Sequence, residues 1–399
     1  MPEKAKANPV STILPYAWVI LWVVYFASVA APLNQFKVPP IMPVLMQTFQ
    51  IDLAQAGALM SVIALVGLIL ALPAGIILQR WGPRLTGLVA LGCMAAGAGM
   101  GALSQSFGGL MTSRIIEGIG IGLIGVVAPA TIAMWFPPER QGGPMGIWAT
   151  WVPVGTVIMY VLAPALAGWG GYPVVWWFGA GFALVMLVVY GWLIRRPPSH
   201  QPGGAAAEEP LDLRKALANR NIWLLALEFA CFNLALVSLG TYYPTFLNEV
   251  RDYPLGQAAL VASIGTMVVL VSAPLAGWLS DRIGSRRLVF SLPFLALAVL
   301  LIFPFRVTGW AIIAVAIIQG LIAGAIPTAT FAAAPEVMRK PQWAGLGLAV
   351  ILIGQNLGQL IGPVLFGQLV NSLGWVSAGN LLVAVCLIGF VSAWMVKIR

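Results

Sequence analysis

Hydrophobic residues occupy long, nearly unbroken runs along the chain, and short polar turns separate these runs. A helix needs about 20 predominantly apolar residues to cross the hydrocarbon core of a bilayer. We therefore expect twelve transmembrane helices, at residues 15–47, 53–79, 85–105, 108–136, 143–168, 172–194, 221–248, 256–280, 287–305, 309–334, 343–371 and 374–396. The pattern predicts an all-α, polytopic membrane protein.

The connection between the sixth and seventh runs differs from the others. It reads "RRPPSHQPGGAAAEEPLDLRKALANR" and is rich in proline, glycine and charge, which is typical of a linker. We expect an N-terminal six-helix bundle at 1–194, a cytoplasmic linker at 195–220 and a C-terminal six-helix bundle at 221–399.

The composition agrees with a membrane protein. Hydrophobic residues make up 60% and charged residues 8% of the chain, and the mean hydropathy is +0.94. Soluble proteins contain about 25% charged residues, so a soluble core does not explain this composition. The three cysteines lie far apart in apolar runs and fit neither a disulfide nor a metal-site spacing.

The net charge of +9 has a topological explanation. If the N-terminus is cytoplasmic, 17 of the 21 lysines and arginines fall on the cytoplasmic side of the predicted spans. Lysine and arginine favour cytoplasmic loops, so we expect a multi-pass protein of the cytoplasmic (inner) membrane with both termini in the cytoplasm. This distribution removes the reason to expect a nucleic-acid partner.

The two predicted halves repeat several features. "GIILQRWGPRL" starts at Gly75 and "GWLSDRIGSRR" starts at Gly277, 202 positions later. Spaced glycines in the fourth and tenth runs, and glycine and proline positions in the fifth and eleventh, recur at nearly the same offset. We therefore expect two pseudo-symmetric bundles, an arrangement typical of secondary transporters that bind substrate between repeats.

With these motifs and "RIIEGIGIG" from Arg114, the chain resembles the major facilitator superfamily over essentially its whole length. The resemblance implies a transporter that works by alternating access. It also implies that the repeated turn fastens the cytoplasmic gate, formed here by Gly75, Arg80, Arg84, Gly277, Asp281, Arg282 and Arg286. The first copy has Gln79 where the family usually has aspartate, so we expect a weaker network there.

Lys37 is an ionisable residue inside the first predicted span, where charge is costly and often functional. Asn34 lies three residues earlier and is expected on the same face, and the following prolines predict a bend just beyond the lysine. Lys37 is a candidate for attracting an anionic substrate at the cavity wall; alternatively, its side chain reaches the outer interface. Organic-anion transporters of the family often place a basic residue two positions earlier, where this chain has Gln35.

Three further ionisable residues fall within predicted spans. Arg114 and Glu117 are three apart on one helical face and are expected to form an ion pair, either structural or functional. The resemblance links the arginine to substrate contact or proton coupling. Glu228 in the seventh span is a second candidate for proton coupling, because burial favours the uncharged carboxyl group, or it pairs with a cytoplasmic arginine.

Neutral polar residues complete the candidate site. Asn233 lies in the seventh span, and Gln355 and Gln359 share one face of the eleventh. They either contact substrate or form hydrogen bonds between helices. The candidate substrate-binding residues are Lys37, Asn34, Arg114, Asn233, Gln355 and Gln359.

The leading functional hypothesis is a secondary transporter of a small organic anion, mono- or dicarboxylate-like, with protons as a possible coupling ion. The alternative is a proton-driven efflux pump for lipophilic or cationic compounds. A nitrate porter is less favoured because neither the second nor the eighth span has a central arginine. The sequence offers no metal cluster, nucleotide motif or catalytic set, so we expect neither an enzyme nor a cofactor. A receptor with this fold stays an alternative, and a monomer suffices for the architecture.

Overall fold

Helices provide the secondary structure of the described residues, which are 15–71, 73–137, 140–195, 218–283, 286–338 and 344–397 of a computed structural model. The N-terminal half contains α1 (Pro15–Gln35), the 3-10 helix η1 (Pro39–Ile41), α2 (Met42–Phe49), α3 (Leu53–Leu70), α4 (Pro73–Leu103), α5 (Phe107–Trp135), α6 (Gly142–Ala149), α7 (Trp151–Gly170) and α8 (Tyr172–Leu193). The C-terminal half contains α10 (Arg220–Glu249), α11 (Leu255–Ile283), α12 (Arg286–Leu300), α13 (Trp310–Ala323), α14 (Ala325–Met338) and α15 (Ala344–Met395). Most of the predicted linker lies outside the described residues.

The described residues support the twelve predicted spans. Ten helical segments are long and apolar enough to cross a membrane, and Ser291–Leu300 is a shorter apolar helix. Gly374, at a φ of 79°, divides α15 into two helices and thereby supplies the twelfth crossing. Gly82, at a φ of 72°, breaks α4 between the second and third predicted spans. Both turns need a backbone conformation that glycine adopts without a steric penalty.

Local sequence signals explain where several helices start. Asp52 begins α3 with a capping box: its side chain accepts a hydrogen bond from the backbone of Gln55, and the Gln55 side chain accepts one from the backbone of Asp52. Ser106 caps α5 and Asn219 caps α10 in the same manner, with one side-chain acceptor each. These caps satisfy amide groups that the first helical turn leaves without partners.

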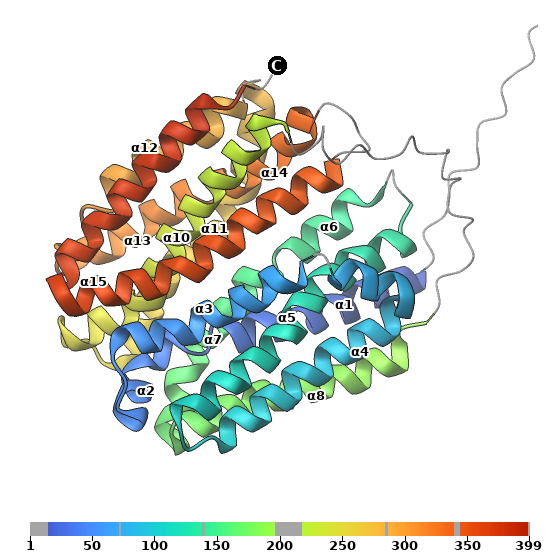
Figure 1. Ribbon diagram of the computed structural model, residues 1–399, viewed down its shortest axis with the longest axis horizontal. Coiled ribbons are helices and arrows are strands. Elements are labelled where there is room, and N and C mark those ends of the chain that lie inside the picture. Colours follow the sequence, from blue (N-terminus) through green and yellow to red (C-terminus); the bar gives the residue numbers. More distant parts are fainter. Residues whose placement is uncertain are drawn as a thin grey trace, which may run out of the picture.

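Two helical bundles lie against each other, one from each half of the chain (Figure 1). Their internal packing is repeated. A Cβ atom on Gly155 of α7 would lie 2.4 Å from Pro32 of α1, and one on Gly354 of α15 would lie 2.1 Å from the carbonyl oxygen of Ala226 on α10. The fifth and eleventh crossings therefore approach the first and seventh so closely that only glycine fits. This equivalence confirms the predicted pseudo-symmetry.

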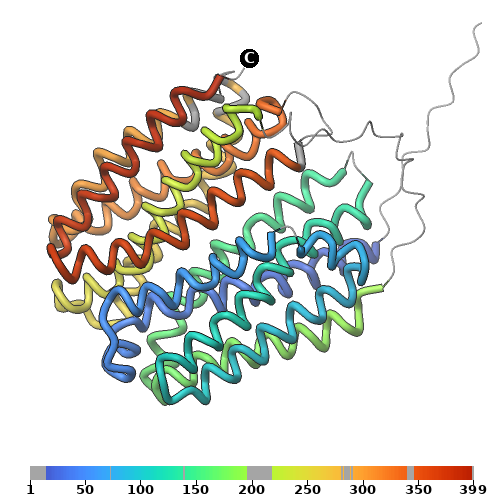
Figure 2. The backbone as a smooth tube through the Cα atoms, in the orientation of Figure 1, coloured from blue at the N-terminus to red at the C-terminus, as the bar shows by residue number. Residues whose placement is uncertain are grey.

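The contacts between the bundles favour one end of the molecule. We call the end that carries Arg195 and Arg220 the linker end, and the other, with Gly171 and Gly374, the opposite end. Helices α3 and α15 pack side by side (Figure 2). Near the opposite end, the Tyr242 hydroxyl of α10 donates to the carbonyl oxygen of Leu53 on α3 at 2.8 Å.

Two more hydrogen bonds join the bundles closer to the middle of the helices. Tyr160 of α7 donates to the carbonyl oxygen of Gly240 at 2.8 Å, and Ser61 of α3 donates to that of Gln359 at 3.4 Å. All three contacts are between neutral groups.

Candidate functional site

Lys37 lies in a break in the first crossing. Helix α1 ends at Gln35 and the chain turns before η1 begins at Pro39, so the predicted bend includes the lysine instead of following it. The Lys37 side chain is fully buried. Its ammonium group donates to Oδ1 of Asn34 at 3.0 Å and lies 4.5 Å from the centre of the Trp176 ring on α8. These contacts face the interior of the N-terminal bundle and not an outer interface.

Glu117 of α5 stands between two cations. Its Oε1 lies 2.6 Å from Nζ of Lys37, and its Oε2 lies 2.5 Å from Nη1 of Arg114. All three side chains are fully buried. The predicted Arg114–Glu117 pair is present, but the participation of Lys37 in it was not predicted. Two positive charges therefore share one negative charge.

Arg114 caps the C-terminal end of α1. Its Nη1 donates to the carbonyl oxygen of Asn34 at 2.5 Å, and its Nη2 donates to that of Gln35 at 2.8 Å. Its Nε donates to the carbonyl oxygen of Leu59 on α3 at 3.1 Å. The last carbonyls of a helix lack intrahelical partners and carry partial negative charge, which a cation stabilises. With the bond to Glu117, the described residues use four of the five N–H groups that a guanidinium has.

A chain of amide side chains crosses between the bundles beside Arg114. Gln35 of α1 donates to Oε1 of Gln359 on α15 at 3.4 Å, and Gln359 donates to Oδ1 of Asn233 on α10 at 3.1 Å. Gln35 and Gln359 are half-buried, whereas Asn233 is almost fully buried. Gln355, one helical turn before Gln359, is also half-buried. The structure thus links three amide groups across the boundary between the bundles, and helical spacing puts Gln355 on the same face as Gln359.

Glu228 lies apart from this network, inside the C-terminal bundle. It is fully buried, and its Oε1 accepts a hydrogen bond of 2.5 Å from the hydroxyl of Thr330 on α14. Its Oε2 has no hydrogen-bond partner among the described residues. Among the described residues no arginine is recorded in contact with Glu228, so the predicted alternative of a cytoplasmic arginine partner finds no support there.

The residues of the repeated turn lie at the linker end. Arg84 donates to the carbonyl oxygen of Gly191 on α8 at 2.6 Å, and the guanidinium of Arg282 lies 5.2 Å from the ring of Trp278 on its own helix. Each of these contacts stays within one bundle. Arg80 is exposed. The side chains of Asp281 and Arg286 lie outside the described residues.

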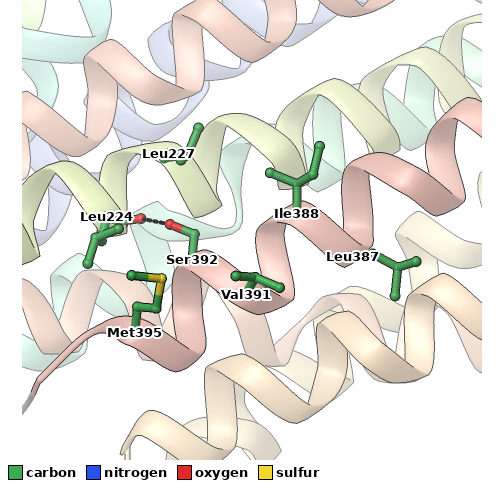
Figure 3. Close-up of a pocket in the computed structure, with 7 residues that line it drawn as sticks. All are labelled: Leu224, Leu227, Leu387, Ile388, Val391, Ser392 and Met395. Atoms are coloured by element: carbon green, nitrogen blue, oxygen red, sulfur yellow. Dashed lines mark hydrogen bonds between the residues drawn. The ribbon is translucent and has the colours of Figure 1, made fainter.

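An apolar groove of about 340 Å³ lies between α10 and the last part of α15, at the linker end (Figure 3). Leucine, isoleucine, valine and methionine side chains line it, together with Ser392, whose hydroxyl donates to the carbonyl oxygen of Leu224 at 2.9 Å. Such a lining suits lipid chains and offers no partner for a polar substrate. Among the described residues, no three histidine, cysteine, aspartate or glutamate side chains gather in a way that could hold a metal ion.

Sequence reasoning missed Trp176, Gln35 and Thr330 as partners of the charged residues. Trp176 is aromatic within an apolar span, and Thr330 is a small polar residue in an alanine-rich helix, so neither differs visibly from packing residues. Gln35 carried a signal, because the resemblance noted in the sequence implies a basic residue at its position.

The sequence profile of the Major Facilitator Superfamily matches residues 24–340 and, in a second alignment, residues 255–399. The chain belongs to this superfamily. As a superfamily member it is a multi-pass membrane protein and a transporter, which confirms the resemblance inferred from the repeated turn and the glycine pattern.

The names of three similar proteins refer to different compounds. This superfamily member is 22% identical to the hexuronate transporter of Bacillus subtilis, across 91% of this chain and 90% of the relative. It is 26% identical to the chloramphenicol resistance protein of Streptomyces lividans, across 92% of this chain and 94% of the relative. It is 28% identical to the probable nitrate/nitrite antiporter NarK1 of Thermus thermophilus, but that match covers 54% of this chain and 51% of the relative.

A solved structure confirms the fold. The bacterial homologue of the human lysosomal transporter Spinster, in an inward-facing and unoccupied conformation, matches 95% of this chain with a TM-score of 0.83 and 17% sequence identity. The match covers 96% of that chain, so the two folds are similar along almost the entire length of both proteins.

Proposed function

We infer that the protein is a secondary transporter that moves a small organic anion, of mono- or dicarboxylate type, across the cytoplasmic membrane by alternating access. The observation that carries this proposal is the surplus positive charge of the buried network. Lys37 and Arg114 share the single carboxylate of Glu117. A surplus charge is costly in a low-dielectric interior, and a bound anion nearby would reduce that cost.

The amide chain provides the groups that would contact such an anion. Gln359 and Gln355 present half-buried amides at the boundary between the bundles, and Asn233 extends this row. Nη2 of Arg114 donates to the carbonyl oxygen of Gln35, at the end of α1 that meets this boundary. Its second N–H group has no partner among the described residues and would be available to the anion. In this arrangement Lys37 acts through its charge, whereas Asn34 holds its ammonium group in place.

The lysines and arginines of the loops support an orientation in which the linker end faces the cytoplasm, and the contacts between the bundles then support a conformation that is open on that side. The three contacts between Tyr242, Tyr160 or Ser61 and the other bundle lie in the middle and opposite parts of the helices. The contacts of Arg84 and Arg282, in the two copies of the repeated turn, stay within their own bundles. We propose that this conformation opens to the cytoplasm with the gate residues separated, and that they meet when the cavity opens outward. Both termini are then cytoplasmic, and a monomer surrounded by lipid suffices.

The alternative function is proton-driven efflux of lipophilic or cationic compounds. The similarity to the chloramphenicol resistance protein across most of the chain favours it. The surplus positive charge argues against a cationic substrate, because like charges would meet in a poorly screened environment.

Thermal unfolding of the purified full chain in detergent tests the two functions. The midpoint temperature of unfolding is measured for the protein without ligand and with each of D-glucuronate, lactate, succinate, nitrate, glucose, chloramphenicol and a cationic dye. A ligand at one hundred times its dissociation constant stabilises the folded protein by about 2.7 kcal/mol. We expect carboxylates to raise the midpoint.

Three variants locate the binding. Lys37→Gln removes the surplus charge but leaves Arg114 paired with Glu117, so it should fold and lose the carboxylate effect. Gln359→Leu should also lose the carboxylate effect, because leucine has no amide group to contact the anion. Gln368→Leu, on the exposed surface of the same helix, is the matched control and should respond like the parent. A carboxylate effect that persists in Lys37→Gln contradicts the role of surplus charge, and stabilisation by chloramphenicol or the dye alone favours efflux.

A further inference from the structure

Glu228 differs from Glu117 in how its carboxyl group is supported. Both residues are fully buried. Each oxygen of Glu117 contacts a cation, at 2.6 and 2.5 Å. Glu228 receives one hydrogen bond from a neutral hydroxyl, that of Thr330, and its second oxygen has no described partner. A buried carboxylate needs a cation or several hydrogen bonds to hold its charge, and Glu228 has neither.

The helices packed around Glu228 offer no basic partner in their interior. Its neighbours α14 and α15 contain no lysine, arginine or histidine, and neither do η1 and α2. On α10 itself Arg220 is eight residues away and exposed, and on α11 Arg282 is exposed beside Trp278.

The other acidic groups and the thiols on these elements do not stabilise a negative charge. Cys231 on α10 and Cys386 on α15 are buried thiols. Glu336 on α14 and Glu249 at the end of α10 are exposed carboxyl groups, and Asp281 on α11 is also acidic. The surroundings of Glu228 therefore favour a neutral side chain in this conformation.

We propose that Glu228 is a proton-binding site of the C-terminal bundle, with Thr330 as its hydrogen-bond partner, whereas Glu117 serves as the counter-ion of Lys37 and Arg114. The Glu228 carboxyl group carries its proton on Oε2, while Oε1 accepts from the Thr330 hydroxyl. When water reaches the group, the O–H bond of Oε2 breaks, its electron pair stays on the carboxylate and the proton passes to water. The inference deepens the proposed function by assigning the coupling proton to Glu228.

Infrared spectroscopy of the full chain in lipid bilayers tests this assignment without any substrate. The C=O stretch of a protonated carboxyl group is separate from the bands of a carboxylate, and it is recorded over a pH series that starts above about pH 6, where ordinary exposed carboxyl groups are ionised. We expect the parent protein to show such a band that disappears reversibly as the pH rises. The band should be absent at every pH in Glu228→Gln, which keeps the shape of the neutral side chain.

Two further variants make the test specific. Thr330→Val removes the hydrogen bond to Oε1 and should move the band to higher frequency, a readout that does not depend on the folding of Glu228→Gln. Glu249→Gln, at the exposed end of the same helix, should leave the band unchanged. A band that persists in Glu228→Gln, or one that no pH removes from the parent, overturns the proposal.

The outcome is independent of the anion experiment. A titrating Glu228 band without stabilisation by carboxylates would leave the proton site standing and contradict the proposed substrate class. Stabilisation by carboxylates without the Glu228 band would support the proposed substrate class and contradict the proton site.

Discussion

The ammonium group of Lys37 lies 2.6 Å from a carboxylate oxygen of Glu117, although the two residues are 80 positions apart in the chain. The same carboxylate binds Arg114 through its other oxygen. This shared anion joins the break after α1 to the middle of the N-terminal bundle. Its removal and the removal of either cation should therefore have different consequences.

Glu117→Gln should destabilise the protein more than Lys37→Met. The glutamine leaves two buried cations without a counter-charge, whereas the methionine leaves one intact pair, and breaking a buried pair costs about 3–5 kcal/mol. The double variant should be more stable than the sum of the two single losses indicates. Thermal midpoints of the three variants and the parent measure this coupling, and strictly additive losses would contradict the shared-anion arrangement.

Gly354→Ala should destabilise the C-terminal bundle. The new Cβ would lie 2.1 Å from the carbonyl oxygen of Ala226, a backbone atom that cannot move aside without shifting α10. Overpacking of this kind costs about 1–3 kcal/mol. Gly125→Ala is the control, because nothing lies within 4 Å of its added Cβ. The thermal midpoint should fall for the first substitution and hold or rise for the second.

Tyr242→Phe should weaken the contact between the bundles while preserving core packing. The hydroxyl contacts the carbonyl oxygens of Leu53 and Pro363 at 2.8 and 2.6 Å, and the ring stacks on Phe366 at 5.2 Å between centroids. Loss of the hydroxyl should cost about 1–3 kcal/mol, because it leaves a buried acceptor unsatisfied.

Tyr190→Phe provides the comparison for this prediction, since its hydroxyl donates to the carbonyl oxygen of Pro83 within one bundle. A cysteine introduced at Ser61 reports the separation of the bundles through its rate of alkylation. That rate should rise with Tyr242→Phe and stay unchanged with Tyr190→Phe; an equal rise in both would show that the effect is not specific to the boundary.

Gln79→Asp should favour the conformation in which the linker end is closed. The substitution restores the carboxylate that the second copy of the turn has at Asp281 and gives basic residues across the gate an anionic partner. A cysteine introduced at Gln355 should then be alkylated more slowly than in the Gln79 parent, measured against the background of the three native cysteines. Gln79→Glu should act in the same direction, and an unchanged rate would argue against a gate role for the turn.

The fold was largely predictable because each crossing must be long and apolar, and because glycine marks the turns at residues 82 and 374. The site was predictable only as a set of residue types. Arg114 and Glu117 lie three apart on one helix, so their pairing follows from helical geometry. The position of Lys37 depends on how α1, α5 and α8 pack, and no local pattern carries that information.

The alternative that Lys37 reaches the outer interface was reasonable for the same reason. A lysine two residues beyond a helix end can extend its side chain in either direction, and the deciding contacts with Glu117 and Trp176 come from distant segments. Likewise, the amides of Gln359 and Asn233 were predictable as a polar row, but their connection to Gln35 required the relative placement of the two bundles.

The break after α1 also has a consequence for biosynthesis. Ribosomes release the first crossing well before α5 is made, so Lys37 enters the bilayer without the carboxylate that later neutralises it. During this interval the lysine carries an insertion penalty of about 2.5–3.5 kcal/mol. Since Arg114 and Glu117 arrive together on one helix, the arrival of α5 supplies both the counter-charge for Lys37 and the partner for the exposed carbonyls of Asn34 and Gln35. The first crossing should therefore settle at its final depth only when the fourth is in the membrane.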